Sequence, residues 1–424
     1  ALTDWLATTG QPGDAFALRP RPDGSPGRYR VPQGVRIGKS MMFDLAGCAL
    51  LTGTTLGADD ARFEANRKMY PALWDDWGEQ SEQDFEFNGN GRTWPKHRVV
   101  LLVAASDVLV TSSRPGARIQ GAARTVRYRS PGVRGRRLST GCNDEPTLEM
   151  QHGIRIGGRP GAHSDANSYR NIVLDLDRIS VEFVHGDGVY LGDNHHHIRI
   201  LGHNLGEPVL GGSTHVDDRA IQGHTGQGGD IIEGGTIDDD RWKPWAEPLP
   251  GIHHTGRHGI ATDFRNYDTL IEGVAIWRTG RAVIDWEPSA SFAEIVGPVI
   301  RGIEVGIHTL LFMPCAGPRP IRDLVCEDVV HYEAPTIGTV QPDATHRHSN
   351  WIIRNNRCVS GVTQRGSPLF ELPRIDGLHI LDNHARVERT VPSVVTDTGG
   401  TGANGPSTAV VIDPGVEVQF GHPR

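Results

Sequence analysis

The sequence predicts an all-β solenoid in which short parallel strands wind into a β-helix. Glycine and proline, 53 and 28 of the 424 residues, are spread through the chain, which favours one long turn-rich unit over several domains. Short apolar runs, each followed by Gly, Asn or Asp, recur at intervals of 25 to 39 residues, and helical periodicity is missing there. The runs centre on Val173, Ile200, Ile232, Ile271, Ile300, Val325, Ile353 and Ile380.

A repeat in the twenties, lengthened here and there by an insertion, is typical of a solenoid. One coil cannot bury its apolar stripe alone, so the coils stack at about 4.8 Å and build a continuous core. The first coil needs a cover, and LTDWLA (2–7) is expected to supply it as a short capping helix. The predicted organisation is an N-terminal cap (1–26), a β-helix (27–390) with an irregular insertion (58–96) and a loop insertion (238–256), and a C-terminal turn-rich segment with a closing strand (391–424).

Composition excludes several classes of protein. The net charge is −8, the pI is about 6.2 and the basic residues are dispersed, which argues against a nucleic-acid partner. The longest apolar run, 99–105, is far shorter than the ~20 residues that span a bilayer, and the first residues do not form an intact signal peptide. Five cysteines without a C-x-x-C spacing predict neither a disulfide scaffold nor a cysteine zinc site. We expect no membrane insertion and no cofactor.

Two segments that follow Thr-Gly align on an arginine. TGRHGIATD carries Arg257 and TGRAVIDWE carries Arg281, so one coil separates them. In this register Asp263 lies over Glu287 at about 4.8 Å, and Asp285 lies on the same strand face about 7 Å from Glu287. The alignment therefore predicts an acidic cluster, with catalytic candidates Asp263, Asp285, Glu287, Arg257 and His258, and with Arg281 beside them as a substrate-binding candidate.

Such a cluster suits glycoside hydrolysis. Two close carboxyls repel, so one keeps its proton and acts as acid while the other stays ionised. Their separation decides between a covalent intermediate (about 5 Å) and an inserted water (about 6.5–9.5 Å). Two alternatives stay open: the carboxylates cap turns and pair with arginines, or they bind sugar passively. Asp285 would leave the cluster as a structural acid if it pointed into the coil.

Further candidates surround this cluster. The segment VHGDGVYLGDN offers Asp187 and Asp193, although Gly-Asp-Gly is also ordinary tight-turn chemistry. The aromatic rings expected to stack on sugar, or else to pack the long loop, are Trp242, Trp245 and Trp286, and His254 lies next to the loop insertion. The run His195-His196-His197 alternates faces in a strand, so at most two ligands converge and no metal site is predicted.

From about residue 10 to 390 the chain resembles the pectate-lyase-like right-handed β-helix superfamily. The resemblance rests on the capping start, the Pro-Gly-rich first coils, HGDGVYLGDN and TGRHGIATDFRNYDTLIEGVAIWRTGRAVIDWEP. Within that superfamily the sequence is most similar to tail-spike or minor tail proteins of phages of actinobacteria. Polygalacturonase-type members use Asn-x-Asp, Asp-Asp, Gly-His-Gly and Arg-x-Lys motifs. This chain has Asp217-Asp218 but neither of the last two in a matching place, which speaks against simple pectin hydrolysis.

The resemblance implies a right-handed helix and, in tail spikes, a homotrimer that binds and often cleaves a bacterial envelope polysaccharide. The expected function is therefore an extracellular, polysaccharide-recognising and polysaccharide-degrading β-helix, a glycoside hydrolase on the virion surface at a phage tail. A glycan receptor-binding or structural tail protein without turnover, and a polysaccharide lyase, remain the alternatives.

Overall fold

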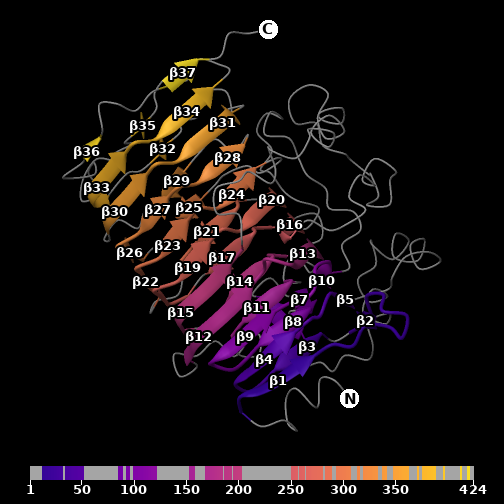
Figure 1. Cartoon of the computed structure of the whole chain (residues 1–424). Helices are drawn as coiled ribbons and strands as arrows, with labels where there is room; N and C mark the ends of the chain where they lie inside the picture. Colours follow the sequence, from indigo (N-terminus) through magenta and orange to yellow (C-terminus); the bar gives the residue numbers. More distant parts are fainter. Residues whose placement is uncertain are drawn as a thin grey trace.

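Stacked parallel strands make up the computed structural model (Figure 1). It describes residues 12–31, 34–51, 85–88, 92–95, 99–121, 152–157, 168–184, 186–192, 194–202, 250–255, 257–262, 264–279, 282–288, 293–306, 313–315, 319–332, 337–340, 347–361, 370–371, 375–387, 395–396, 411–412 and 418–420. These residues contain strands and no helix, so the predicted all-β parallel β-helix is confirmed. The predicted capping helix (2–7) lies outside the described residues.

The first sheet has 14 strands: β1 (Asp14–Ala17), β4 (Met41–Asp44), β9 (Val108–Thr111), β12 (Ser168–Asp175), β15 (Asn194–Leu201), β18 (Asn266–Tyr267), β19 (Leu270–Glu272), β22 (Ile295–Val296), β23 (Val299–Arg301), β26 (Ile321–Arg322), β27 (Val325–Glu327), β30 (His348–Arg354), β33 (Ile375–Leu381) and β36 (Val411–Ile412). The second has 11: β2 (Arg28–Arg30), β5 (Ala49–Leu51), β10 (Ala117–Gln120), β13 (Ile179–Val184), β16 (Gly251–Thr255), β20 (Ala275–Thr279), β24 (Glu304–Gly306), β28 (Val330–Tyr332), β31 (Arg357–Gly361), β34 (His384–Val387) and β37 (Val418–Phe420).

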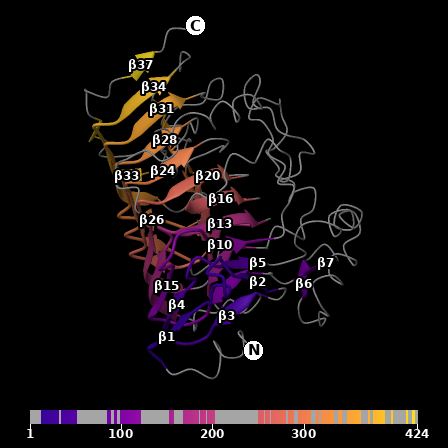
Figure 2. The same cartoon turned by 45° about the vertical axis from the view of Figure 1, so that its right-hand side comes forward.

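The third sheet has 6 strands: β3 (Val35–Ile37), β8 (Leu101–Val103), β11 (Ile154–Ile156), β14 (Val189–Leu191), β17 (Ile260–Thr262) and β21 (Ile284–Trp286). A fourth sheet has 4: β25 (Met313–Cys315), β29 (Ile337–Val340), β32 (Phe370–Glu371) and β35 (Val395–Thr396). Chain order passes from sheet to sheet, as in β12, β13, β14 and then β15, so this coil visits the first, second and third sheets in turn (Figure 2).

The core is built from columns of identical positions in successive coils. In the first sheet, Leu174 pairs with Ile200, Ile200 with Ile271, and Ile271 with Ile300, and all four side chains are fully buried. Each such side chain contributes about 1.5–3 kcal/mol through burial. The apolar runs found in the sequence therefore supply the interior of the helix.

At two of the run centres named from the sequence, the inward-facing side chain belongs to the next residue. The residue that faces inward is Leu174 rather than Val173, and Cys326 rather than Val325, because the register pairs Ile300 with Cys326. Ile200 pairs directly with Ile271, and the run around Ile232 lies outside the described residues.

Parallel strand pairing extends into both terminal segments of the predicted organisation. β1 already pairs in parallel with β4, so stacking reaches into the segment assigned to the N-terminal cap (1–26). β35, β36 and β37 extend their sheets into the C-terminal segment (391–424). An antiparallel hairpin, β6 (Phe85–Asn88) with β7 (Arg92–Pro95), lies in the segment predicted as irregular (58–96), and β16 begins inside the predicted loop (238–256).

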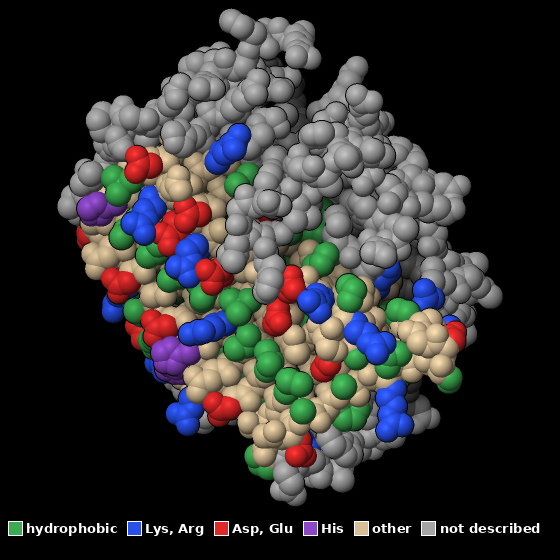
Figure 3. All heavy atoms as spheres, viewed as in Figure 1, with side chains coloured by type: hydrophobic (Ala, Val, Ile, Leu, Met, Phe, Trp, Pro, Cys, Tyr) green, Lys and Arg blue, Asp and Glu red, His purple; other side chains and the backbone are tan. Residues whose placement is uncertain are grey.

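The outer face of the first sheet mixes charges with an apolar column. Arg301 Nη2 lies 2.7 Å from Glu272 Oε1, and Arg354 Nη2 lies 2.6 Å from Glu327 Oε2. Acidic and basic side chains alternate with hydrophobic ones over this face (Figure 3). The outward positions between the charges are aliphatic in several coils: Met42, Leu109, Val173, Leu270, Val299, Val325 and Ile352. No described helix is long and apolar enough to cross a membrane.

Candidate functional site

A polar column precedes the third sheet at the same point of three coils. His152, Asp187 and His258 each stand two residues before a strand, and the pairing of β11 with β14 and of β14 with β17 stacks them in that order. The local sequences are His-Gly-Ile, Asp-Gly-Val and His-Gly-Ile. In the next coil Ala282 and Val283 take these positions, so the column ends there.

The glycines of this pattern are required by close packing. A Cβ on Gly188 would lie 2.2 Å from Cγ2 of Ile252 and 2.8 Å from the carbonyl oxygen of Gly259. A Cβ on Gly259 would meet Cγ2 of Ile276 at 2.5 Å. The corner between the second and third sheets therefore holds its backbone in a fixed place, which also fixes where the preceding polar side chain starts.

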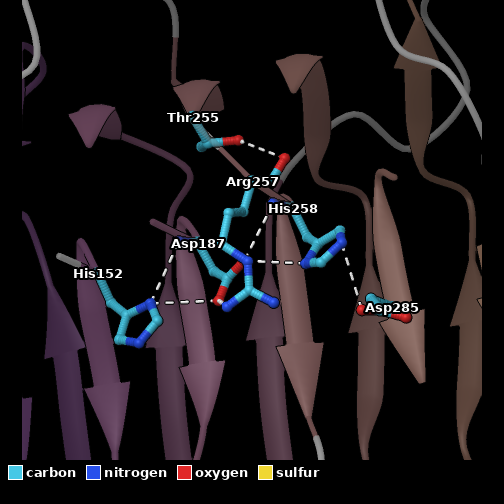
Figure 4. Close-up of polar contacts among 6 residues, drawn as sticks. All are labelled: His152, Asp187, Thr255, Arg257, His258 and Asp285. Carbon is cyan, nitrogen blue, oxygen red and sulfur yellow. Dashed lines mark hydrogen bonds and ion pairs between the residues drawn. The ribbon is translucent and has the colours of Figure 1, made fainter. Parts of the chain in front are cut away.

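Asp187 joins the members of the column (Figure 4). Its Oδ1 accepts hydrogen bonds from the backbone N–H of His258 at 3.0 Å and lies 3.0 Å from Nδ1 of the same residue. Its Oδ2 lies 3.2 Å from Nδ1 of His152 and 3.8 Å from Nη1 of Arg257. One fully buried carboxylate thus holds both the backbone and the ring of His258.

His258 reaches a second carboxylate on its other side. Its Nε2 lies 3.3 Å from Oδ2 of Asp285, and both side chains are about 5% exposed. Asp285 faces outward, because its neighbours Ile284 and Trp286 are both in the hydrophobic core. The alternative that Asp285 points into the coil is therefore wrong.

The charges of the column follow from its surroundings. Burial alone would raise the pKa of Asp187, but the Arg257 guanidinium, the neighbouring His152 ring and the hydrogen bonds from His258 hold that pKa well below its usual range. Burial lowers the pKa of His152, against the opposing effect of Asp187. Asp187 is therefore ionised and His152 neutral near pH 7.

These charges determine the protons on His258. Since ionised Asp187 only accepts hydrogen bonds, Nδ1 of His258 must carry a proton. Nε2 of His258 lies 3.3 Å from Oδ2 of Asp285, so a proton on either atom can be donated to the other. The pair lies at the outer face of the third sheet.

Glu287 follows this pair on the chain. Its backbone N–H donates to the carbonyl of Thr262 at 2.9 Å, which continues the parallel ladder one step past β21. Strand alternation places Glu287 on the outward side with Asp285, and Glu287 is half-buried. The pairing of Ile260 with Ile284 confirms the predicted one-coil register between the Arg257 and Arg281 segments.

The other predicted site residues fall into two groups. The Trp286 ring lies fully buried in the hydrophobic core, where a sugar cannot stack on it. The others lie outside the described residues or, for His254, have a side chain that is not described: Asp263, Arg281, Trp242, Trp245, Asp193 and His254.

Sequence reasoning missed His152. The signal was present, because His152, Asp187 and His258 share the order polar residue, glycine, β-branched residue ahead of a strand. The residues are 35 and 71 positions apart, however, which hides the fact that their coils are neighbours.

A second buried polar cluster lies on the outer face of the second sheet. Ser180 Oγ is 2.6 Å from Nε2 of His253 and donates to Oε2 of Glu182 at 3.1 Å. The His253 ring stacks on Trp277 at 4.3 Å. Burial raises the pKa of Glu182, although Arg118 at 3.4 Å opposes this shift.

The histidine run has no metal-binding arrangement among the described residues, which contain no group of three potential ligands. His195 is buried, His196 stacks on Tyr267 at 4.7 Å, and His197 is exposed with Nδ1 3.6 Å from Asp268. A positive φ of 56° at His197 breaks the simple alternation of faces expected for a strand.

Comparisons with known proteins give only distant similarities. No protein-family model matches the chain, and no curated protein matches it. A solved polygalacturonase from Erwinia carotovora is 12% identical, with a TM-score of 0.38, and 100% of this chain and 92% of that chain are covered. A family 28 exopolygalacturonase from Yersinia enterocolitica is 9% identical, with a TM-score of 0.41 and coverage of 99% and 74%. A DFA-IIIase from Arthrobacter chlorophenolicus is 10% identical, with a TM-score of 0.32 and coverage of 93% and 85%.

Proposed function

We propose that this protein binds and cleaves an extracellular polysaccharide on the outer face of its third sheet. The observation that carries the proposal is the approach of Nε2 of His258 to Oδ2 of Asp285, 3.3 Å apart with both side chains about 5% exposed. Glu287 supplies a second carboxyl on the same outward side. An acid that keeps its proton beside a more exposed carboxylate is the pair that glycoside hydrolysis needs.

In the proposed reaction Asp285 gives its proton to the glycosidic oxygen as the bond from that oxygen to the anomeric carbon breaks. Glu287 either attacks the anomeric carbon or takes a proton from the water that does, according to the separation of the two carboxyls. Water supplies the hydroxyl that ends on the anomeric carbon. If Glu287 attacks the anomeric carbon, Asp285 recovers its proton from the water that later cleaves the glycosyl-enzyme bond. If Glu287 takes a proton from the attacking water, it releases that proton to solvent and Asp285 takes one up from solvent.

The purely structural alternative explains less. Turns at another corner are capped by neutral side chains, since Asn356 Oδ1 accepts the backbone N–H of Val329 and Asn383 Oδ1 accepts that of Asn356. Capping at that corner therefore needs no charge. A buried carboxylate costs desolvation energy that an amide avoids, which favours a chemical use for Asp187 and Asp285.

The test is the release of new reducing ends from a panel of actinobacterial wall polysaccharides and pectins. Glu287→Gln is expected to lower the rate at least about 100-fold with glycan binding retained. Glu272→Gln, on the first sheet, is the matched control and should leave the rate unchanged. Equal rates in the wild type and Glu287→Gln would refute the proposed role of Glu287.

Binding without turnover is the second candidate, favoured by the burial of Asp285. It predicts saturable binding of one glycan and no new chain ends from any of them. A lyase, supported by Arg257 beside the carboxylates, predicts absorbance near 235 nm together with the new ends.

The biological setting we propose rests on the sequence resemblance alone. We infer a homotrimeric phage tail-spike or minor tail component, exposed on the virion, that recognises a bacterial envelope glycan. A sedimentation measurement that finds a monomer would contradict the tail-spike assignment.

A further inference from the structure

His152 lies deepest in the polar column and takes no part in the proposed reaction. Its ring is fully buried and stacks face to face on Tyr190, with centroids 4.5 Å apart and planes 5° apart. The guanidinium carbon of Arg155 lies 5.0 Å from the centre of the same Tyr190 ring. The ring of His152 is thus held in one orientation.

The backbone N–H of Asp187 points at Nδ1 of His152 at 3.2 Å. The next step of the column repeats this contact, because the N–H of His258 donates to Oδ1 of Asp187. Each polar side chain therefore fixes the turn of the following coil. His152 fixes the turn that carries Asp187, and Asp187 fixes the turn and ring of His258.

We propose that His152 is a positioning residue that, through Asp187, sets the proton affinity of His258 and Asp285. This inference rests on the proposed function for its purpose, but its physical content is independent of turnover. With Nδ1 occupied by the amide, neutral His152 has its proton on Nε2 and leaves the full charge of Asp187 to act on His258. That charge stabilises the imidazolium form of His258.

The charged groups that face His152 give the direction of the coupling. They are Asp187 from the turn before β14, Arg155 from β11 and Arg257 from the turn before β17. Burial and the two arginines keep His152 neutral. A proton on Nδ1 of His152 would instead be donated to Oδ2 of Asp187, 3.2 Å away, and would neutralise the charge that His258 experiences.

The experiment uses the full chain with ¹⁵N-labelled histidine and follows the ring nitrogens by NMR across pH. The signals of His152 and His258 are assigned from single His→Gln variants. In the wild type at pH 7, Nδ1 of His258 should carry a proton and Nδ1 of His152 should not. A protonated Nδ1 on His152 at pH 7 would overturn the proposal without any variant for comparison.

His152→Leu removes the acceptor of the Asp187 amide and should lower the apparent pKa of His258 by about one unit. His152→Asn restores an acceptor oxygen near the position of Nδ1, and the apparent pKa of His258 in this variant should lie within about 0.3 unit of the wild-type value. An unchanged His258 titration in folded His152→Leu also overturns the proposal. If His152→Leu does not fold, the proposal is tested by the His258 titration in His152→Asn and by the positions of the histidine ring protons in the wild type.

The chain offers a matched control. His348 Nδ1 accepts the backbone N–H of Ile321 at 2.9 Å, and its ring packs on Trp351 at 5.1 Å. His348→Leu removes the same kind of cap on a later coil and should leave the His258 titration where it is. An equal shift of the apparent pKa of His258 in His152→Leu and His348→Leu would indicate a general destabilisation of the fold and would refute a specific role for His152.

The outcomes separate this inference from the proposed function. A shifted His258 titration with no cleavage of any glycan refutes the proposed enzyme and keeps the positioning role. Glycan cleavage that depends on Glu287, with an unchanged His258 titration in His152→Leu, supports the proposed enzyme and refutes the positioning role of His152. If both hold, the acidic limb of the pH profile of kcat/KM should move with the His258 titration.

Discussion

Replacing Asp187 with asparagine tests whether the buried carboxylate stabilises the protein through its charge. Asparagine keeps the shape and one acceptor oxygen, so the two contacts of Oδ1 with the N–H and Nδ1 of His258 can persist. What is lost is the negative charge between His152, His258 and Arg257. The change therefore isolates the electrostatic part of the interaction.

The magnitude follows from the two hydrogen bonds. A hydrogen bond to a charged group contributes about 1.5–3 kcal/mol and a bond to a neutral group about 1 kcal/mol, so each bond loses about 0.5–2 kcal/mol. With two such bonds, Asp187→Asn should lower the free energy of unfolding by about 1–4 kcal/mol at pH 7. The pKa of Asp187 is depressed in the fold from an ordinary value of 3.8. The stabilisation by the Asp187 carboxylate is therefore complete above pH 3.8 and is lost as the pH falls through the pKa of Asp187 in the folded protein. The variant and the wild type should converge in acid.

Urea unfolding at several pH values measures this difference, with the slope of the transition compared between proteins. Asp107→Asn is the control, since Asp107 is exposed, accepts a hydrogen bond from Asn171 Nδ2 at 2.8 Å and has a positive φ that asparagine tolerates. It should change stability by less than about 0.5 kcal/mol. The reasoning fails if Asp187→Asn costs no more than Asp107→Asn, or if its cost is the same at pH 7 and pH 3.

Two further predictions concern stability. Burial raises the pKa of Glu182, so this carboxyl contributes stability below its ordinary value of 4.5 that is lost as the pH rises through the folded value. Glu182→Gln should therefore raise the urea midpoint at pH 7 but not at pH 4, and an unchanged midpoint at pH 7 would contradict this. Gly259→Ala should lower stability by about 1–3 kcal/mol, because its Cβ would lie 2.5 Å from Ile276 and 2.6 Å from the carbonyl oxygen of Val283. Gly24→Ala, with nothing within 4 Å, should lose only the smaller cost of its positive φ, as thermal unfolding of both variants would show.

The fold class was predictable because the apolar runs recur and the inside of each coil demands them. Register was predictable only where a motif marked it, as with Arg257 and Arg281. Elsewhere, apolar residues on the outer face obscure the alternation of apolar and polar residues along a strand. In the run Ile172-Val173-Leu174 the outward residue is as apolar as its inward neighbours, so alternation does not say which residue enters the core.

The site was predictable in part for a related reason. Asp285 and Glu287 were found because they lie two positions apart on one strand face, and Arg257 and His258 because their segment aligns with the Arg281 segment one coil later. Asp187 and His152 lie on neighbouring coils separated from His258 by long insertions. Sequence distance therefore says little about their contact, and only the strand pairing of β11, β14 and β17 brings them together.

The uneven spacing of the coils has a consequence for the order of folding. Successive coils near the C-terminal end join residues 27 apart, as between Val329 and Asn356, whereas Asp187 and His258 are 71 apart. Closing the longer segment costs about 0.9 kcal/mol more in chain entropy. Solenoids nucleate where neighbouring units join most easily and then propagate. The regular C-terminal coils should therefore form first, and the junction that carries Asp187 and His258 should close late in folding.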